Sequence, residues 1–226
     1  MEIIIIPACG LASRIGNIPK FLLPIKSDST LIKNILEIAH DSNFKNIWIS
    51  TLPKYANMLH EYLHEYAPNI KITYTMTMSE TIYQYKHLNL QKTIMVMPDT
   101  YINDTKIFSK ISDELKESDV VVCVWKINEY QKGNLGQCFI DNNNNVTNVV
   151  DKDASCEYPY AWGVLGWNNI FWDYIDPNTS HVGYALNPAI KDGLKIKAIY
   201  MDDIYNDCGT FDEYVKLINF ISKNKV

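Results

Sequence analysis

The chain opens on a run of apolar residues. Ile3 to Ile6 are continuously apolar and β-branched, and Pro7 closes the run. Such a run predicts a strand that is buried on both faces of a mainly parallel sheet, because a half-exposed strand would alternate apolar and polar residues. Apolar residues then follow helical spacing over 31–40, and 47–51 is predicted to be a second strand. The first fifty residues therefore predict a strand, a loop, a helix and another strand.

The same alternation continues along the chain. Apolar periodicity predicts further helices at 55–66, 81–88, 108–116, 184–192 and 211–222, and further strands at 70–74, 93–97, 120–125, 162–167 and 196–201. Two more strands, at 136–140 and 146–150, flank the asparagine-rich run 142–145, which predicts a hairpin. Alternating strands and helices are typical of an α/β domain.

Composition narrows the class of protein. With 226 residues, 47% of them apolar, the chain can bury one substantial core, and no repeat or glycine-rich linker divides it, so residues 1–226 are predicted to form a single domain. The net charge of −5 gives no bulk attraction for nucleic acid or an anionic membrane. The first apolar run is too short for a signal peptide or a membrane span. We therefore expect a cytoplasmic protein that binds neither nucleic acid nor membrane, with a homo-oligomer left open.

The five cysteines carry no recognisable site pattern. They are widely scattered and odd in number, with no CxxC or Cys/His spacing that would build a zinc site or a disulfide framework. We expect reduced thiols, and we expect Cys9 and Cys208 to pack as small buried apolar groups.

The loop that follows the first strand carries the first candidate chemistry. Ala8, Gly10, Ala12 and Ser13 are small, so the backbone N–H groups of this loop can approach an anion closely. Arg14 and Lys20 add a bidentate guanidinium and a compact ammonium, two groups that suit phosphate oxygens. The combination favours phosphoryl or nucleotidyl transfer. The alternative is an ordinary turn with two surface cations.

Two acidic positions are the next candidates. Asp99 directly follows the strand predicted at 93–97, and open α/β sheets bind ligands at the carboxyl ends of their strands. It is well placed to hold magnesium, although a lone aspartate there also serves as a turn former or helix cap. Asp207 precedes the last helix, where Thr210 and Glu213 match a capping box. A capping role for Asp207 is therefore the alternative to metal binding.

Together these motifs carry a family resemblance. Gly10, Ser13, Arg14, Pro19 and Lys20 match G-x-G-[ST]-R followed by P-K, the signature of the sugar-phosphate nucleotidyltransferases, with Ala12 replacing the second glycine. Neither G-x-G-x-x-G nor G-x-x-x-x-G-K-[ST] is present, which counts against a dinucleotide fold or a Walker loop. The chain resembles this family from residue 1 to about 215. The resemblance implies a Rossmann-like three-layer α/β sandwich with a mixed, mainly parallel sheet, the GT-A-like nucleotidyltransferase fold.

The resemblance also implies roles for individual residues. It makes Arg14 and Lys20 catalytic, and Asp99 and Asp207, the latter in a D-x-G-T segment, the ligands of Mg²⁺, which usually takes one or two carboxylates. Asp151 and Lys152 resemble the E-K pair that contacts the sugar phosphate. Gly163 would lie beside the sugar, or would form a bulge. The implied nucleotide-binding residues are Ala8, Cys9, Gly10, Leu11, Ala12, Ser13, Thr77, Ser79 and Glu80.

The implied reaction is attack by an acceptor phosphate on the α-phosphorus of a nucleoside triphosphate, with release of pyrophosphate. UTP or dTTP with a sugar 1-phosphate is the first expectation. A cytidylyltransferase acting on a phosphorylated alcohol such as choline phosphate, and a catalytically silent protein that binds nucleotide sugars, are the alternatives. Because an ionised phosphate needs no general base, the five histidines are expected to be bystanders.

Overall fold

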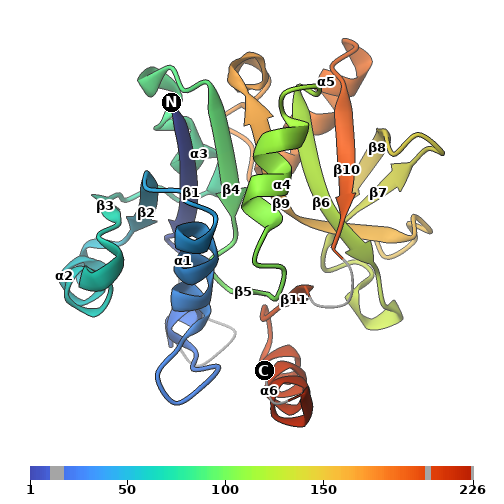
Figure 1. Cartoon of the computed structure of the whole chain (residues 1–226). Coiled ribbons are helices and arrows are strands. Elements are labelled where there is room, and N and C mark those ends of the chain that lie inside the picture. Colours follow the sequence, from blue (N-terminus) through green and yellow to red (C-terminus); the bar gives the residue numbers. More distant parts are fainter. Residues whose placement is uncertain (11–17, 202–204, 225–226) are drawn as a thin grey trace.

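The computed structural model describes residues 1–10, 18–201 and 205–224, and its centre is one large sheet (Figure 1). Over these residues the sheet has nine strands, and its main path runs β10-β6-β9-β4-β1-β2-β3. Neighbouring strands of this path are parallel except at β9, which is antiparallel to both β4 and β6. The hairpin β7–β8 joins the sheet through β9. The predicted mixed, mainly parallel sheet is confirmed.

The nine strands keep the predicted order. They are β1 (Glu2–Ala8), β2 (Ile47–Thr51), β3 (Asn69–Ile72), β4 (Lys92–Val96), β6 (Val120–Lys126), β7 (Gly136–Ile140), β8 (Val146–Asp151), β9 (Tyr160–Asn168) and β10 (Ile196–Tyr200).

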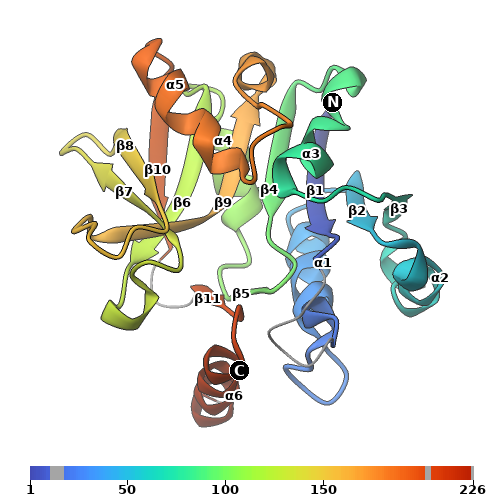
Figure 2. The ribbon, with the colours of Figure 1, turned by 180° about the vertical axis from the view of Figure 1, so that it is seen from behind.

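Helices cover both faces of the sheet. In Figure 1, α1 (Leu31–Asp41) and α4 (Ile107–Glu114) lie in front of the sheet, with α2 (Pro53–Tyr62) at its β3 edge; Figure 2 shows α3 (Met78–Tyr83) and α5 (Leu186–Lys191) on the other face. The strand β1 is apolar throughout because it contributes to both layers: Ile4 and Ile6 pack with α1, whereas Ile3 and Ile5 pack with α3 and α5. This is the predicted three-layer arrangement.

Several helices are shorter than the ranges predicted from the apolar pattern, and 3₁₀ segments occupy the rest of those ranges. The helix predicted at 81–88 begins earlier, at Met78, because the hydroxyl of Thr77 caps it by accepting a hydrogen bond from the backbone N–H of Glu80 at 3.1 Å. The 3₁₀ segments are η2 (Lys20–Leu22), η3 (His64–Tyr66), η4 (Lys86–Leu88), η5 (Glu129–Gln131), η6 (Asn169–Asp173) and η7 (Val182–Ala185).

A second, two-stranded sheet joins distant parts of the chain. β5 (Thr100–Ile102) pairs antiparallel with β11 (Tyr205–Asp207), in a register that sets Asp207 opposite Thr100. The backbone N–H of Cys208 donates a hydrogen bond to the carbonyl oxygen of Asp99 at 2.8 Å. Main-chain pairing therefore brings the two candidate metal ligands together.

The last helix, α6 (Phe211–Asn224), lies apart from the main sheet, next to the β5–β11 ribbon (Figure 1). Its Leu217 and Ile221 pack in a small core with Tyr101 of β5 and with Cys208. The ribbon is thereby fixed between the helix and the rest of the domain.

The five cysteines are free thiols. Cys208 is buried as predicted, whereas Cys9 is only partly buried. Over the part of the chain that the structure describes, no helix has both the length and the apolar character needed to cross a bilayer.

Candidate active site

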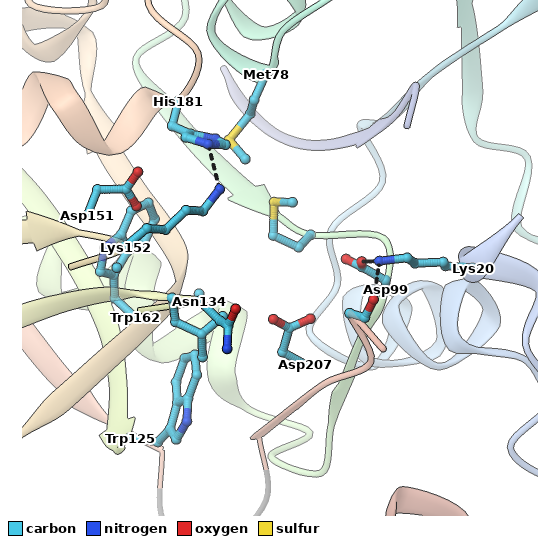
Figure 3. Close-up of a pocket in the computed structure, with 15 residues that line it drawn as sticks. Lys20, Met78, Asp99, Trp125, Asn134, Asp151, Lys152, Trp162, His181 and Asp207 are labelled. Atoms are coloured by element: carbon cyan, nitrogen blue, oxygen red, sulfur yellow. Dashed lines mark hydrogen bonds and ion pairs between the residues drawn. The ribbon is translucent and has the colours of Figure 1, made fainter. Parts of the chain in front are cut away.

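The candidate site is a cavity of about 210 Å³ at the carboxyl ends of β4, β6 and β8 (Figure 3). Polar and apolar residues from nine segments of the chain line it. They are Lys20, Met78, Met97, Asp99, Trp125, Asn134, Leu135, Gly136, Asp151, Lys152, Trp162, Gly163, His181, Asp207 and Gly209. This is the edge of an open α/β sheet at which ligands are expected to bind.

One end of the cavity holds a cation between acidic groups. The ammonium of Lys20 lies 3.1 Å from a carboxylate oxygen of Asp99, and it donates to the carbonyl oxygen of Gly209 at 2.8 Å. The side chains of Lys20 and Asp99 are each 16% exposed. Because Gly209 follows the ribbon strand that carries Asp207, this contact ties η2 to both candidate metal ligands (Figure 3).

The carboxylate of Asp207 is electrostatically destabilised. Burial, together with the negative charges of Asp99 and Glu213, raises its pKa to about 7 despite the opposing effect of Lys20. A divalent cation would relieve this repulsion, and carboxylate oxygens are the ligands that Mg²⁺ prefers. Asp99 and Asp207 line the same cavity and therefore fit a magnesium ion that keeps its remaining positions for phosphate and water.

The opposite end of the cavity carries Lys152 and His181. Lys152 follows β8 and has a left-handed backbone with φ of 52°, an uncommon conformation for a residue other than glycine. Its ammonium lies 2.8 Å from Nε2 of His181 (Figure 3). Burial and the charge of Lys152 lower the pKa of His181, an effect that Asp151 partly opposes. A neutral imidazole thus faces the ammonium.

The indole of Trp162 forms part of the wall beside Lys152. It packs against two glycines so closely that a Cβ atom would lie 2.3 Å from its Nε1 at Gly136 and 2.4 Å from its Cζ2 at Gly183. The neighbouring Gly163 sits where the pairing of β6 with β9 shifts register, between Trp162 and Val164. The bulge considered for Gly163 is therefore present, and the same residue lines the cavity.

Replacing Gly183 by Ala is expected to destabilise the protein by roughly 1–3 kcal/mol, because the new methyl group overlaps the rigid indole of Trp162. Denaturant unfolding monitored by circular dichroism measures the change. The second substitution Trp162→Phe removes the ring atoms that the methyl group meets, so the double variant should lose less stability than the two single changes combined. Additive losses would contradict this account of the packing.

A second hollow of about 160 Å³ adjoins the cavity, since Met78 and Met97 line both. The end of β1, the start of the following loop and the β3–α3 segment form it, contributing Pro7, Cys9, Gly10, Thr75, Met76, Thr77 and Thr81. Burial raises the pKa of the Cys9 thiol, while hydrogen bonds with Thr81 and Thr75 oppose this shift. The hollow therefore presents hydroxyl groups, backbone and a neutral thiol.

The structure brings most of the sequence-predicted residues to these two hollows. Lys20, Asp99, Asp151, Lys152, Gly163 and Asp207 line the larger one, and Cys9, Gly10 and Thr77 line the smaller one. Ala8 is buried as the last residue of β1. Arg14, Leu11, Ala12 and Ser13 lie outside the described residues.

Two of the nucleotide-binding predictions fall elsewhere. Ser79 is fully buried, and its hydroxyl pairs with that of Thr179 at 3.0 Å. A carboxylate oxygen of Glu80 accepts the backbone N–H of Met76 at 2.9 Å. Neither residue lines the smaller hollow, because Glu80 binds the turn that opens α3 and Ser79 binds the distant Thr179. Thr77, which caps that helix, is the member of the segment that reaches the hollow.

Several cavity residues lie in no sequence motif. The sequence predicts that His181 is a bystander, yet it lines the cavity and contacts Lys152. Trp125 and Asn134 also line it, from the end of β6 and the loop before β7. Among these residues, only Trp125 could have been found from the sequence. It ends the apolar run of β6, and this strand ends at the same edge of the sheet as β4, which Asp99 follows.

The chain also matches a known protein family. The family model for nucleotidyl transferases matches residues 14–224, nearly the whole chain. The protein therefore belongs to the nucleotidyl transferase family. A search among curated proteins finds no match.

Solved structures agree on the fold. A Bacillus anthracis protein, described as a proposed glucose-1-phosphate thymidylyltransferase in complex with sucrose, superposes with a TM-score of 0.83 at 15% identity, covering 97% of this chain and 95% of its own. A UDP-glucose pyrophosphorylase complexed with UDP-glucose gives 0.81 at 16% identity, with 99% of both chains covered. The inositol-1-phosphate CTP transferase from T. maritima gives 0.78 at 13% identity, covering 99% of this chain and 97% of its own.

Proposed function

We propose that this nucleotidyltransferase joins a nucleoside triphosphate, with UTP or dTTP favoured, to a sugar 1-phosphate and releases pyrophosphate. The observation that carries the proposal is the single cavity with Lys20, Asp99 and Asp207 at one end and Lys152 at the other. Two phosphorylated substrates repel each other, so a catalyst must hold positive charge beside both of them.

Each end of the cavity takes one part in the proposed reaction. The smaller hollow receives the base, and the triphosphate extends toward Lys20, whose ammonium stabilises the charge that builds around the α-phosphorus. Lys152 holds the acceptor phosphate. One acceptor oxygen attacks, the bond to pyrophosphate breaks, and no proton has to be removed because the attacking phosphate is already ionised.

Asp99 and Asp207 would hold a magnesium ion for this reaction. The ion, when bound, would neutralise phosphate charge, and it would also relieve the repulsion between the two carboxylates that raises the pKa of Asp207. Lys20 supports the same arrangement, because its contacts with Asp99 and with the carbonyl oxygen of Gly209 link the two segments that carry the carboxylates.

The lining of the cavity favours a polyhydroxylated acceptor. Asp151 and Asn134 offer oxygen and amide groups suited to hydroxyls, and Gly163 lines the same cavity without a side chain. The structural neighbours include proteins described as acting on glucose 1-phosphate and on inositol 1-phosphate. These features support a sugar 1-phosphate over choline phosphate, whose cationic head group carries no hydroxyl donor.

Pyrophosphate release tests the proposal. The purified protein is incubated with Mg²⁺, each of ATP, GTP, CTP, UTP and dTTP, and each of glucose 1-phosphate, inositol 1-phosphate and choline phosphate. We expect release that needs both substrates and is fastest with UTP or dTTP and glucose 1-phosphate. Fastest release with CTP and choline phosphate would overturn the acceptor class. Binding of a nucleotide sugar without any release would favour a silent regulatory protein instead.

A further inference from the structure

Lys152 has an unusual partner for a lysine that lines a cavity. Its ammonium contacts Nε2 of His181 at 2.8 Å, and among the described residues it makes no ion pair with its chain neighbour Asp151. An ammonium has three donors and no acceptor, so Nε2 must accept the hydrogen bond. His181 is therefore neutral in this pair, with its proton on Nδ1.

The backbone around Lys152 restricts the side chain further. Its φ of 52° directs the chain sharply out of β8, and its backbone N–H donates to the carbonyl oxygen of Leu135 at 3.2 Å. Left-handed backbone costs free energy in residues other than glycine, so surrounding contacts must maintain it. These contacts fix the backbone at the end of β8, and the side chain of Lys152 points into the cavity (Figure 3).

His181 is itself fixed by its neighbours. Its carbonyl oxygen accepts the backbone N–H of Tyr184 at 3.2 Å, and its ring lies against that of Tyr184 with centroids 6.1 Å apart. The adjacent Ser180 accepts the backbone N–H of Met78 at 3.2 Å, which ties this segment to α3. The imidazole therefore acts as a fixed acceptor.

We propose that His181 is a positioning residue that aims the ammonium of Lys152 at the acceptor phosphate, an inference that rests on the proposed nucleotidyl transfer. A neutral imidazole orients the lysine without cancelling its charge, whereas a carboxylate would compete with the phosphate for it. Two ammonium protons remain for acceptor oxygens. His181 thereby prepares the acceptor end of the cavity.

Steady-state kinetics test this role, with UTP and glucose 1-phosphate as substrates. His181→Leu should raise the KM for glucose 1-phosphate roughly tenfold or more, as expected when a charge-assisted hydrogen bond loses its geometry, while the KM for UTP stays unchanged. His181→Gln supplies a neutral oxygen acceptor and should restore most of the loss. His60→Leu, at an exposed position outside the cavity, is the matched control. Equal loss in the Gln and Leu variants, or an unchanged KM for glucose 1-phosphate, would overturn the proposal.

A measurement that needs no activity separates this proposal from the function itself. Long-range ¹H–¹⁵N spectra of the full chain should show His181 with its proton on Nδ1, and Lys152→Met should shift the Nε2 resonance. If it does not shift, the pair is absent in solution and the inference fails. If the pair is present but no triphosphate and acceptor combination gives pyrophosphate, the proposed function fails and the role toward an acceptor phosphate fails with it.

Discussion

Replacing Asp207 by Asn is expected to lower magnesium-dependent turnover about a hundred- to a thousandfold, the range seen when one group that stabilises transition-state charge is removed. The amide keeps the size of the side chain and loses the negative charge that holds the cation. Asp99→Asn should behave in the same way. Initial rates over a magnesium titration measure the effect, and excess magnesium should recover only part of the rate.

The same substitution separates function from stability. Because burial and repulsion raise the pKa of Asp207 to about 7 in the folded protein, ionising this group destabilises the fold as the pH rises from near 4 to 7. At pH 8 without divalent ions, Asp207→Asn should therefore melt at a higher temperature than the wild type. Asp212→Asn, at an exposed acid of the same segment, is the control that should change neither property much. Wild-type turnover in Asp207→Asn would remove this residue from the metal site.

Lys20→Ala is expected to reduce kcat by roughly a hundredfold or more, because it removes the ammonium that contacts Asp99 and that would stabilise charge at the triphosphate end of the cavity. Its two contacts, with Asp99 and with the carbonyl oxygen of Gly209, place it where charge would build during transfer. Single-turnover rates at saturating triphosphate report the chemical step separately from binding.

A matched lysine distinguishes local charge from total charge. Lys26 is exposed in the loop that follows η2 and lies outside the cavity, so Lys26→Ala should keep wild-type kinetics. Thermal unfolding of both variants checks that each is folded. A normal kcat in Lys20→Ala would contradict the proposed role, whatever its effect on the affinity for triphosphate.

Periodicity predicts the main sheet and fails where segments are short. Continuous apolar runs predict buried strands such as β1 and β6, and helical spacing of apolar residues over 31–40 predicts α1. The strands β5 and β11 have three residues each, too few for any period to register, and their pairing joins positions about a hundred residues apart. Long-range pairing of this kind depends on the folded domain, so local patterns do not reveal it.

The candidate site divides in a similar way. Lys20, Asp99, Asp207 and Lys152 lie in motifs that the sequence displays, and the structure brings their side chains to one cavity. His181 stands in no motif, and its place in the cavity and its contact with Lys152 distinguish it from the other histidines. Glu80 and Ser79 also lie in a predicted segment, but they line neither hollow. Glu80 accepts the backbone N–H of Met76, and Ser79 pairs with the hydroxyl of Thr179.

The β5–β11 ribbon makes the catalytic proposal sensitive to the far end of the polypeptide. A chain cut before residue 205 would retain every strand of the large sheet and both lysines of the cavity, yet it would have lost one carboxylate together with the helix that anchors it. Shortened versions of this domain can therefore be well folded and inert. In engineering it, fusions belong at the amino terminus, and the carboxyl-terminal helix has to be kept whole.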